Sequence, residues 1–315
     1  MNSRVSILIL FFVLLGEVVH SQYYDKQNGW KTYKHELIGG FGFCNYLGEL
    51  GGGSGDGRVW LMDLEMSQFK PSFNLGYRYN LSYRTSARLH FLKGKISGSD
   101  QLTENETRRY RNLSFQTDIY EFTALFEYWI LRSKPGHVYH IKGAKGERGM
   151  PFEVSAFAGV GAFYFNPKSD GIPLRPLSTE GQGLPGGPPI YSPISVAFPF
   201  GMAGNIAITN RFKLGMEASF RYTLTDYLDD ASGVYFDNDQ IRAAKGEVAA
   251  AMADRTDGSN PGWSAVDAPR GNPKQNDFYL SFMINATYNI TRLTPKVSRP
   301  GGRHSFLKSG RKARF

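Results

Sequence analysis

Long stretches of the chain alternate between apolar and polar residues with a period of two, which is typical of strands with two different faces. The clearest stretch covers residues 73–83, where a stripe of tyrosine, phenylalanine and leucine alternates with a polar stripe. Its eleven residues match the length of a tilted strand that crosses a bilayer. Residues 277–290 repeat the pattern, with Phe282 and Ile284 on one stripe and Asn285 on the other.

Six further stretches alternate less regularly, so we expect eight strands in all. Pro199 lies inside one of them and cannot donate a backbone hydrogen bond to a neighbouring strand. We therefore expect that strand to bulge or bend at Pro199. The six further strands are expected over residues 35–46, 87–96, 120–130, 152–165, 194–208 and 213–222.

The links between these strands alternate in length. Tight turns are expected near Arg84–Ser86 and Thr209–Arg211, and the link over 132–150 is a longer exception on the same rim. Long loops are expected over 47–70, 97–112, 166–191 and 226–276. Short turns on one rim and long loops on the other are typical of outer-membrane barrels. The sequence thus predicts an all-β fold, an eight-stranded antiparallel up-and-down transmembrane β-barrel with long extracellular loops. A water-soluble barrel, with its aromatic stripe inside, is the alternative.

Composition and the chain ends support export. Arg4 precedes the apolar run Val5–Leu15, and small or polar residues follow up to Ser21, as in a cleavable export signal. The remaining chain has no other apolar run near 18 residues, yet the sequence holds 23 Phe, 18 Tyr and 36 Gly. This composition suits a membrane barrel. We expect a signal peptide over 1–21, an N-terminal periplasmic segment over 22–34, the barrel over 35–290 and a basic periplasmic tail over 291–315.

The polar stripes carry charged residues that must face the lumen if the aromatic stripes face lipid. Eight strands leave room inside for side chains but not for an aqueous channel, and buried charges must be paired. We expect a network of Arg–Glu pairs among small Gly and Ser neighbours, with no pore; a polar conduit is the alternative. The expected interior residues are Arg78, Arg88, Glu121, Glu127, Glu217 and Arg221.

Basic residues gather on the rim of the short turns. Without the eight cations of the tail, and without Arg4 and Glu17 of the signal, the 37 Lys and Arg and 28 Asp and Glu become 28 and 27, so the basicity belongs to the tail. A basic periplasmic rim suits an acidic protein or an anionic polymer, and an unstructured solvated tail is the alternative. The candidate partner-binding residues in the link over 132–150 are Arg132, Lys134, Lys142, Lys145 and Arg148.

Other chemistry is weakly represented. Asp226, Asp229 and Asp230 could supply oxygen ligands to calcium, but they lack the spacing of a known calcium loop, so hydrogen bonds that order the loop are expected instead. None of the six His falls in a recognisable catalytic motif, so we expect no enzyme activity. We also expect no cofactor and no nucleic-acid partner. Residues 240–255 have helical spacing, with Asp237 or Asn238 placed to cap a short helix and Gly246 unfavourable within it.

Several short motifs follow one another along the predicted barrel. After the first and fifth strands come Asn45–Leu50 and Phe165–Lys168, followed by Leu177–Gly183. The last two motifs are Thr225–Tyr235, which includes Asp226, Tyr227, Asp229 and Asp230, and Arg270–Asp277, which includes Arg270, Gly271, Asn272, Pro273, Asn276 and Asp277. With these motifs the chain resembles the PorG-type outer-membrane proteins of the type IX secretion and gliding machinery, over about residues 35–290; the basic tail lies outside the resemblance.

The resemblance implies a structural and assembly role. A barrel of this kind would lie in outer-membrane lipid, with its short turns and both termini in the periplasm. It would anchor a periplasmic ring, formed by a lipoprotein and its partner (PorK and PorN, or the corresponding gliding proteins), and would not conduct protein itself. The alternative is a generic small outer-membrane barrel that binds extracellular ligands or surfaces through its loops.

Overall fold

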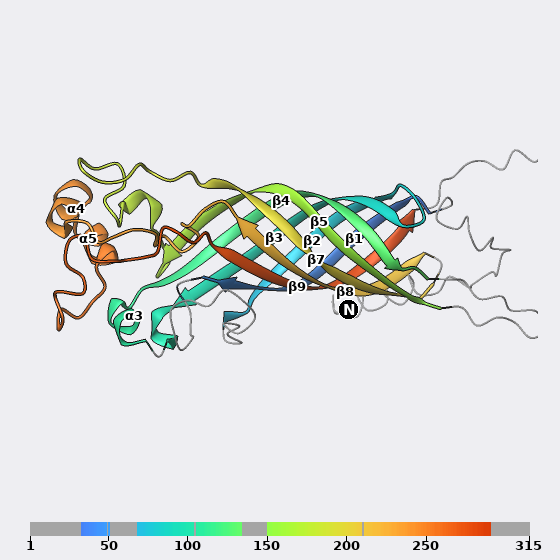
Figure 1. Cartoon of the computed structure of the whole chain (residues 1–315), viewed down its shortest axis with the longest axis horizontal. Coiled ribbons are helices and arrows are strands. Elements are labelled where there is room, and N and C mark those ends of the chain that lie inside the picture. Colours follow the sequence, from blue (N-terminus) through green and yellow to red (C-terminus); the bar gives the residue numbers. More distant parts are fainter. Residues whose placement is uncertain are drawn as a thin grey trace, which may run out of the picture.

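The protein forms a closed antiparallel β-barrel whose strands run obliquely along its long axis (Figure 1). One end of the barrel carries long loops with short helices, and we call it the loop end; the opposite end carries the tight turns and is called the turn end. The computed structural model describes residues 33–48, 50, 68–103, 105–133, 150–209 and 211–290.

Eight strands make up the wall of the barrel, and each pairs with its neighbours in chain order. Pairing of β1 with β9 and of β4 with β5 leaves none of these eight strands at an open edge. This confirms the predicted fold class. The eight strands are β1 (His35–Leu47), β2 (Lys70–Asn80), β3 (Thr85–Ser99), β4 (Ser114–Leu131), β5 (Phe152–Ser169), β7 (Ile194–Ala207), β8 (Phe212–Thr223) and β9 (Phe278–Ile290).

Two tight turns of similar chemistry lie at the turn end. Ser82 Oγ accepts hydrogen bonds from the backbone N–H groups of Arg84 and Thr85, at 3.1 and 3.0 Å. Thr209 Oγ1 accepts in the same way from Arg211 and Phe212. Side chains of Ser and Thr favour such turns because they offer the backbone a local acceptor. The first turn occupies residues 81–84, so the predicted extension of the second strand to residue 83 is wrong.

The strand ladders are regular at the point where a bulge was expected. Pro199 pairs with Arg221 of β8 in a register that runs unbroken from Ala197 to Ala207. On the β5 side the ladder is interrupted beside Pro199, but the register before and after it is the same. The predicted bulge at Pro199 is therefore wrong, because the missing N–H group interrupts the pairing without inserting a residue. A register shift occurs instead in β4, between Trp129 and Leu131.

The outer face of the barrel is apolar around its circumference. Phe73, Leu75, Phe122, Phe126 and Met216 come from three different strands and are 54–70% exposed. They belong to the stripes that the period-two pattern placed outside. A continuous exposed apolar surface of this kind needs an apolar surrounding. Within the described ranges, no helix is both long enough and apolar enough to span a bilayer.

Short elements fold over the loop end (Figure 1). The expected helix over 240–255 is two helices, because Gly246 adopts a φ of 93° between them and the chain changes direction there. Asp237 caps the first of them, accepting from the N–H groups of Asp239 and Gln240. The elements at this end are η3 (Asp100–Leu102), α3 (Glu106–Arg111), β6 (Ile172–Pro173), η4 (Arg175–Leu177), α4 (Asn238–Lys245) and α5 (Glu247–Ala253).

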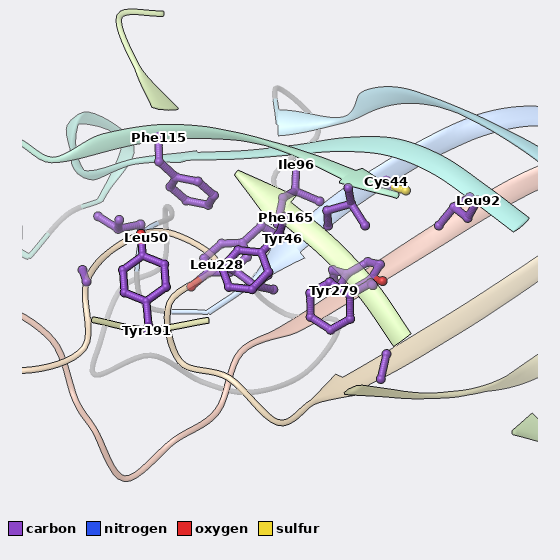
Figure 2. Packing of buried hydrophobic residues seen from close by; sticks show 14 of the residues in the cluster. Cys44, Tyr46, Leu50, Leu92, Ile96, Phe115, Phe165, Tyr191, Leu228 and Tyr279 are labelled. Carbon is purple, nitrogen blue, oxygen red and sulfur yellow. The ribbon is translucent and has the colours of Figure 1, made fainter. Parts of the chain in front are cut away.

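The interior is packed differently at the two ends. Near the loop end the lumen is filled by apolar and aromatic side chains, among them Ile96, Phe115, Phe165 and Tyr279 (Figure 2). Leu228 enters this cluster from the loop between β8 and β9 and is fully buried. The prediction of small Gly and Ser neighbours missed this apolar plug. Charged side chains fill the half of the lumen nearer the turn end.

Candidate functional site

A chain of alternating charges crosses the lumen near the turn end. Arg78 contacts Glu36 at 2.8 Å and also contacts Glu127. Arg88 lies between two carboxylates, with Nε 2.8 Å from Glu127 and Nη1 2.6 Å from Glu217. Because all five side chains are at most 2% exposed, each charge depends on its neighbours for compensation.

Lys213 extends this charge chain to the far side of the lumen. Its Nζ lies 3.2 Å from Glu36 and 2.8 Å from Glu153. The completed ionic ladder consists of Glu217, Arg88, Glu127, Arg78, Glu36, Lys213 and Glu153, and it joins six strands. Sequence reasoning did not name Glu36, Glu153 and Lys213 as interior residues. The period-two pattern could have identified these three residues, since each lies in the polar stripe of its strand.

A second charged layer separates the ionic ladder from the apolar plug. Arg221 donates from Nε to Glu121 at 2.7 Å and from Nη1 to Ser281 Oγ at 2.7 Å. The hydroxyl of Tyr279 donates to the same carboxylate. With these two layers, the structure places all six predicted interior residues in the lumen and in ion pairs.

At the loop end, acidic residues of two sequence motifs meet above the plug. Tyr46 contacts two carboxylates through its hydroxyl, Asp277 Oδ1 at 2.5 Å and Asp229 Oδ2 at 2.8 Å. The second oxygen of Asp277 accepts from the backbone N–H of Leu228 at 2.9 Å. Burial and the neighbouring carboxylates of Asp229 and Asp226 hold the pKa of Asp277 well above its usual range, which favours its protonated form. These contacts hold the loop after β8 inside the barrel mouth.

Asp230 fixes the adjoining loop to the same assembly. Its carboxylate accepts hydrogen bonds from Thr179 Oγ1 at 2.5 Å and from the Tyr191 hydroxyl at 2.6 Å. Burial raises the pKa of Asp230 to about 6, although Arg270 and the two hydroxyl donors oppose this shift. Tyr227 stacks on Tyr191 with ring centroids 4.4 Å apart. The loop between β5 and β7 is thereby joined to the loop between β8 and β9.

Arg270 and Glu180 connect the last motif to the others. Arg270 donates to Glu180 Oε1 at 3.0 Å and to the backbone oxygen of Asp230 at 2.6 Å. Glu180 also accepts from the N–H groups of Ser232 and Gly233, at 2.9 and 3.2 Å. Tyr46 and the motifs 177–183, 225–235 and 270–277 therefore form one interlocked unit, which we call the loop cap.

The remaining motif residues have local roles or lie at the surface. Gly271 packs against the backbone of residues 231–232, where an added Cβ would lie 2.7 Å from Ser232 N. Asn276 donates to the hydroxyl of Tyr222 at 2.9 Å, whereas Asn272 and Pro273 are exposed. The aspartates considered as calcium ligands do not converge on one point. Among the residues that the structure describes, no group of three or more His, Cys, Asp or Glu is arranged to hold a metal ion.

A pocket of about 560 Å³ opens beside the loop cap, between α3 and the loop that joins β8 to β9. Its walls and floor include Arg108, Tyr110, Arg111, Tyr235, Trp263 and Arg270. We call it the loop-end pocket. Of these residues, Tyr235 and Arg270 belong to motifs found in the sequence, whereas Arg108, Tyr110, Arg111 and Trp263 lie outside those motifs.

At the turn end, the structure describes one of the five predicted partner-binding residues. Arg132 donates to the Tyr83 backbone oxygen at 2.7 Å and to Asn80 Oδ1 at 2.9 Å, and its guanidinium lies 4.9 Å from the centre of the Trp129 ring. These contacts hold Arg132 against the barrel wall. The other four residues lie outside the described residues: Lys134, Lys142, Lys145 and Arg148.

Comparison with known proteins gives one family match and several similar solved structures. Residues 31–133, about a third of the chain, match a family described as a domain of unknown function (DUF6089). No curated protein matches the chain. The solved structure of Neisserial surface protein A (NspA) is similar, at 8% identity and a TM-score of 0.39, over 82% of this chain and 97% of that one. Ail of Yersinia pestis is similar at 12% identity and a TM-score of 0.34, over 81% and 97%.

A major outer membrane protein of Thermus thermophilus is similar at 11% identity and a TM-score of 0.32, over 81% of this chain and 99% of that one. At these identities and TM-scores, the similarity carries nothing about partners or ligands. The assignment of a closed eight-stranded barrel rests on the strand pairing of this chain.

Proposed function

We propose that this protein is a non-conducting outer-membrane barrel that serves as a structural and assembly component of a type IX secretion system, where it anchors a periplasmic ring to the outer membrane. The observation that carries the proposal is a barrel with an apolar exterior and a lumen closed by the ionic ladder and the apolar plug. The proposal assigns it no catalytic role.

The exterior supports insertion into lipid. The wall strands have 11–18 residues, enough to cross a hydrocarbon core of about 30 Å when tilted. Tyrosines such as Tyr77, Tyr120 and Tyr164 are 38–43% exposed on the outside of the strands, as is common where a barrel meets the interfaces. With its tight turns toward the periplasm, the barrel would have both termini on that side.

The filled lumen supports an anchoring role over a conducting one. Arg78, Arg88 and Arg221 are at most 2% exposed, and each is paired across the interior. Toward the loop end Phe163, Phe165 and Tyr279 pack together, with the Phe163 ring 5.5 Å from that of Phe165 and 6.2 Å from that of Tyr279. An eight-stranded barrel has no room for a path beside such side chains. The polar conduit considered from the sequence therefore has no support from this packing.

Two kinds of observation support docking to a ring at the turn end. The first is the resemblance of the sequence motifs to PorG-type proteins, which implies a lipoprotein ring and its partner of the PorK and PorN kind. The second is charge. Arg84 and Arg211 are exposed in the tight turns, and the sequence predicts that the basic link with Lys142, Lys145 and Arg148 belongs to the same rim. A basic rim would attract an acidic ring surface.

Affinity purification of the tagged protein from solubilised envelopes, followed by mass spectrometry, tests the proposed role. We expect ring components to co-purify, and we expect neutralisation of Lys142, Lys145 and Arg148 to reduce their yield. Neutralisation of Lys274, an exposed residue at the loop end, is the matched control and should leave the yield unchanged. Absence of ring components would favour a generic barrel; unchanged association of the triple variant would reject docking through charge alone.

A further inference from the structure

The loop-end pocket is a built site rather than a gap between mobile loops. Arg111 of α3 forms two hydrogen bonds of 2.8 Å with the carboxylate of Asp100 and also donates to the backbone oxygen of Arg270. The backbone N–H of Asn260 donates to the Tyr110 hydroxyl at 3.0 Å. These contacts join α3 to two parts of the loop between β8 and β9. The volume of about 560 Å³ is within the range of small-molecule sites.

The charge of the pocket favours an anionic group. Three arginines line it and no Asp or Glu does. Arg111 and Arg270 have acidic partners in Asp100 and Glu180, but half-buried Arg108 has no ion pair with any described residue. Arg108 can therefore supply a charge-assisted, bidentate contact to a carboxylate.

Two residues that line the pocket each carry a buried polar atom with no hydrogen-bond partner among the described residues. These atoms are the hydroxyl oxygen of Tyr235, a side chain that is 4% exposed, and Nε of Arg270, which is 2% exposed. Burial raises the pKa of Tyr235 to about 12, so that its hydroxyl stays protonated and can donate. Buried donors without a partner are costly, and a ligand oxygen that contacts them would satisfy them.

The remaining walls distinguish a saccharide from a peptide. Tyr110 and Trp263 meet edge to face, with ring centroids 5.4 Å apart, and offer flat apolar surfaces with polar edges. Around them lie Thr107, Asn272 and Gln275, whose hydroxyl and amide groups suit a ligand with many hydroxyls. No Val, Leu, Ile or Met lines the pocket, so Pro269 is the one aliphatic side chain beside its aromatic rings, and an apolar peptide side chain would find little aliphatic surface.

We propose that the loop-end pocket binds a short oligosaccharide that carries a carboxylate, with Arg108 contacting the carboxylate and Trp263 with Tyr110 contacting a sugar ring. This inference goes beyond the anchoring role and does not depend on it, because it concerns only the loop end of the purified barrel.

Binding of fluorescently labelled tetragalacturonate to the full chain in detergent micelles tests the proposal, with the methyl-esterified tetrasaccharide as the probe that lacks the charge. We expect saturable binding of the acid form and at least about tenfold weaker binding of the ester, as for the loss of a charge-assisted contact. A second pair, sialyllactose and lactose, tests other acidic sugars. Sialyllactose is expected to bind more tightly than lactose, and a library of acidic peptides is expected not to bind.

Variants separate the pocket from the rest of the loop end. Arg108→Ala and Trp263→Ala should each weaken binding at least about tenfold, whereas Arg109→Ala on the same helix and Val266→Ala on the same loop should leave it unchanged, because neither residue lines the pocket. Arg108→Lys should retain part of the affinity. Heat-modifiable electrophoretic mobility checks that each variant is folded.

Three results would overturn the proposal. One is the absence of binding by both acidic saccharides up to millimolar concentration. Another is binding that the Arg108 and Trp263 variants do not change. The third is tight binding of an acidic peptide in place of the saccharides. None of these results bears on co-purification with a periplasmic ring.

Discussion

Glu127→Gln is the substitution that tests the ionic ladder most directly. Glu127 is fully buried between Arg78 and Arg88. Its Oε2 contacts Arg78 and its Oε1 contacts Arg88. Glutamine has nearly the same shape, so the change removes a charge and adds no cavity. Each arginine then keeps a single carboxylate, Glu36 for Arg78 and Glu217 for Arg88.

The expected cost follows from the burial of these groups. Removing one partner of a buried ion pair costs about 3–5 kcal/mol, because the remaining charge is not compensated by water. With a denaturant dependence of about 1–3 kcal/mol per molar urea, the unfolding midpoint should fall by at least about 1 M. Asp118→Asn is the matched control. Asp118 is 24% exposed and pairs with Lys168 and Lys95 near the surface, so its loss should cost less than about 1 kcal/mol.

Equilibrium unfolding in urea, in lipid vesicles, measures both variants. Tryptophan fluorescence is a suitable readout because the Trp129 ring is buried in the lumen, with the Arg78 guanidinium 5.0 Å from its centre. If Glu127→Gln and Asp118→Asn lowered the free energy of unfolding by the same small amount, the lumen would have to be hydrated. The reasoning from a closed interior would then be refuted.

Three further perturbations probe other parts of the molecule. Leu75→Arg, at a site 65% exposed in the middle of β2, should lower the free energy of unfolding in vesicles by about 2–4 kcal/mol; no loss of stability would argue against contact of this face with lipid. The pKa of Asp230 is raised from 3.8 to about 6, so its contribution to loop-cap stability is greatest below about pH 4 and declines as the pH rises through 6. Protease cleavage of the loops, measured between pH 4 and 7, should depend less on pH in Asp230→Asn. An unchanged pH profile would show that another group causes the dependence. Gly271→Ala should loosen the loop cap by about 1–3 kcal/mol, because the new Cβ meets the backbone at Ser232. Cleavage by trypsin no faster than in the parent protein would contradict this.

The loop cap shows where prediction from sequence was limited. The motifs 225–235 and 270–277 were visible in the sequence, but the contacts between them were not. Asp229 and Asp277 share the hydroxyl of Tyr46, which lies 183 and 231 residues away from them. Local patterns identify turn residues and helix caps, such as Asp237, because those hydrogen bonds join close neighbours. Contacts between loops depend on which loops the closed barrel brings to the same end.

The sequence by itself predicted the fold class and showed which residues of the clearest strands share a face, because a period of two separates the two faces of a strand. It therefore placed Arg78 and Glu127 in the interior. Only the tertiary structure decided that they pair with each other, since that depends on the stagger of the strands at closure and on the filling of the lumen. The same holds for the apolar plug and the loop-end pocket, because each is built from residues that are distant in the chain and meet only in the closed barrel.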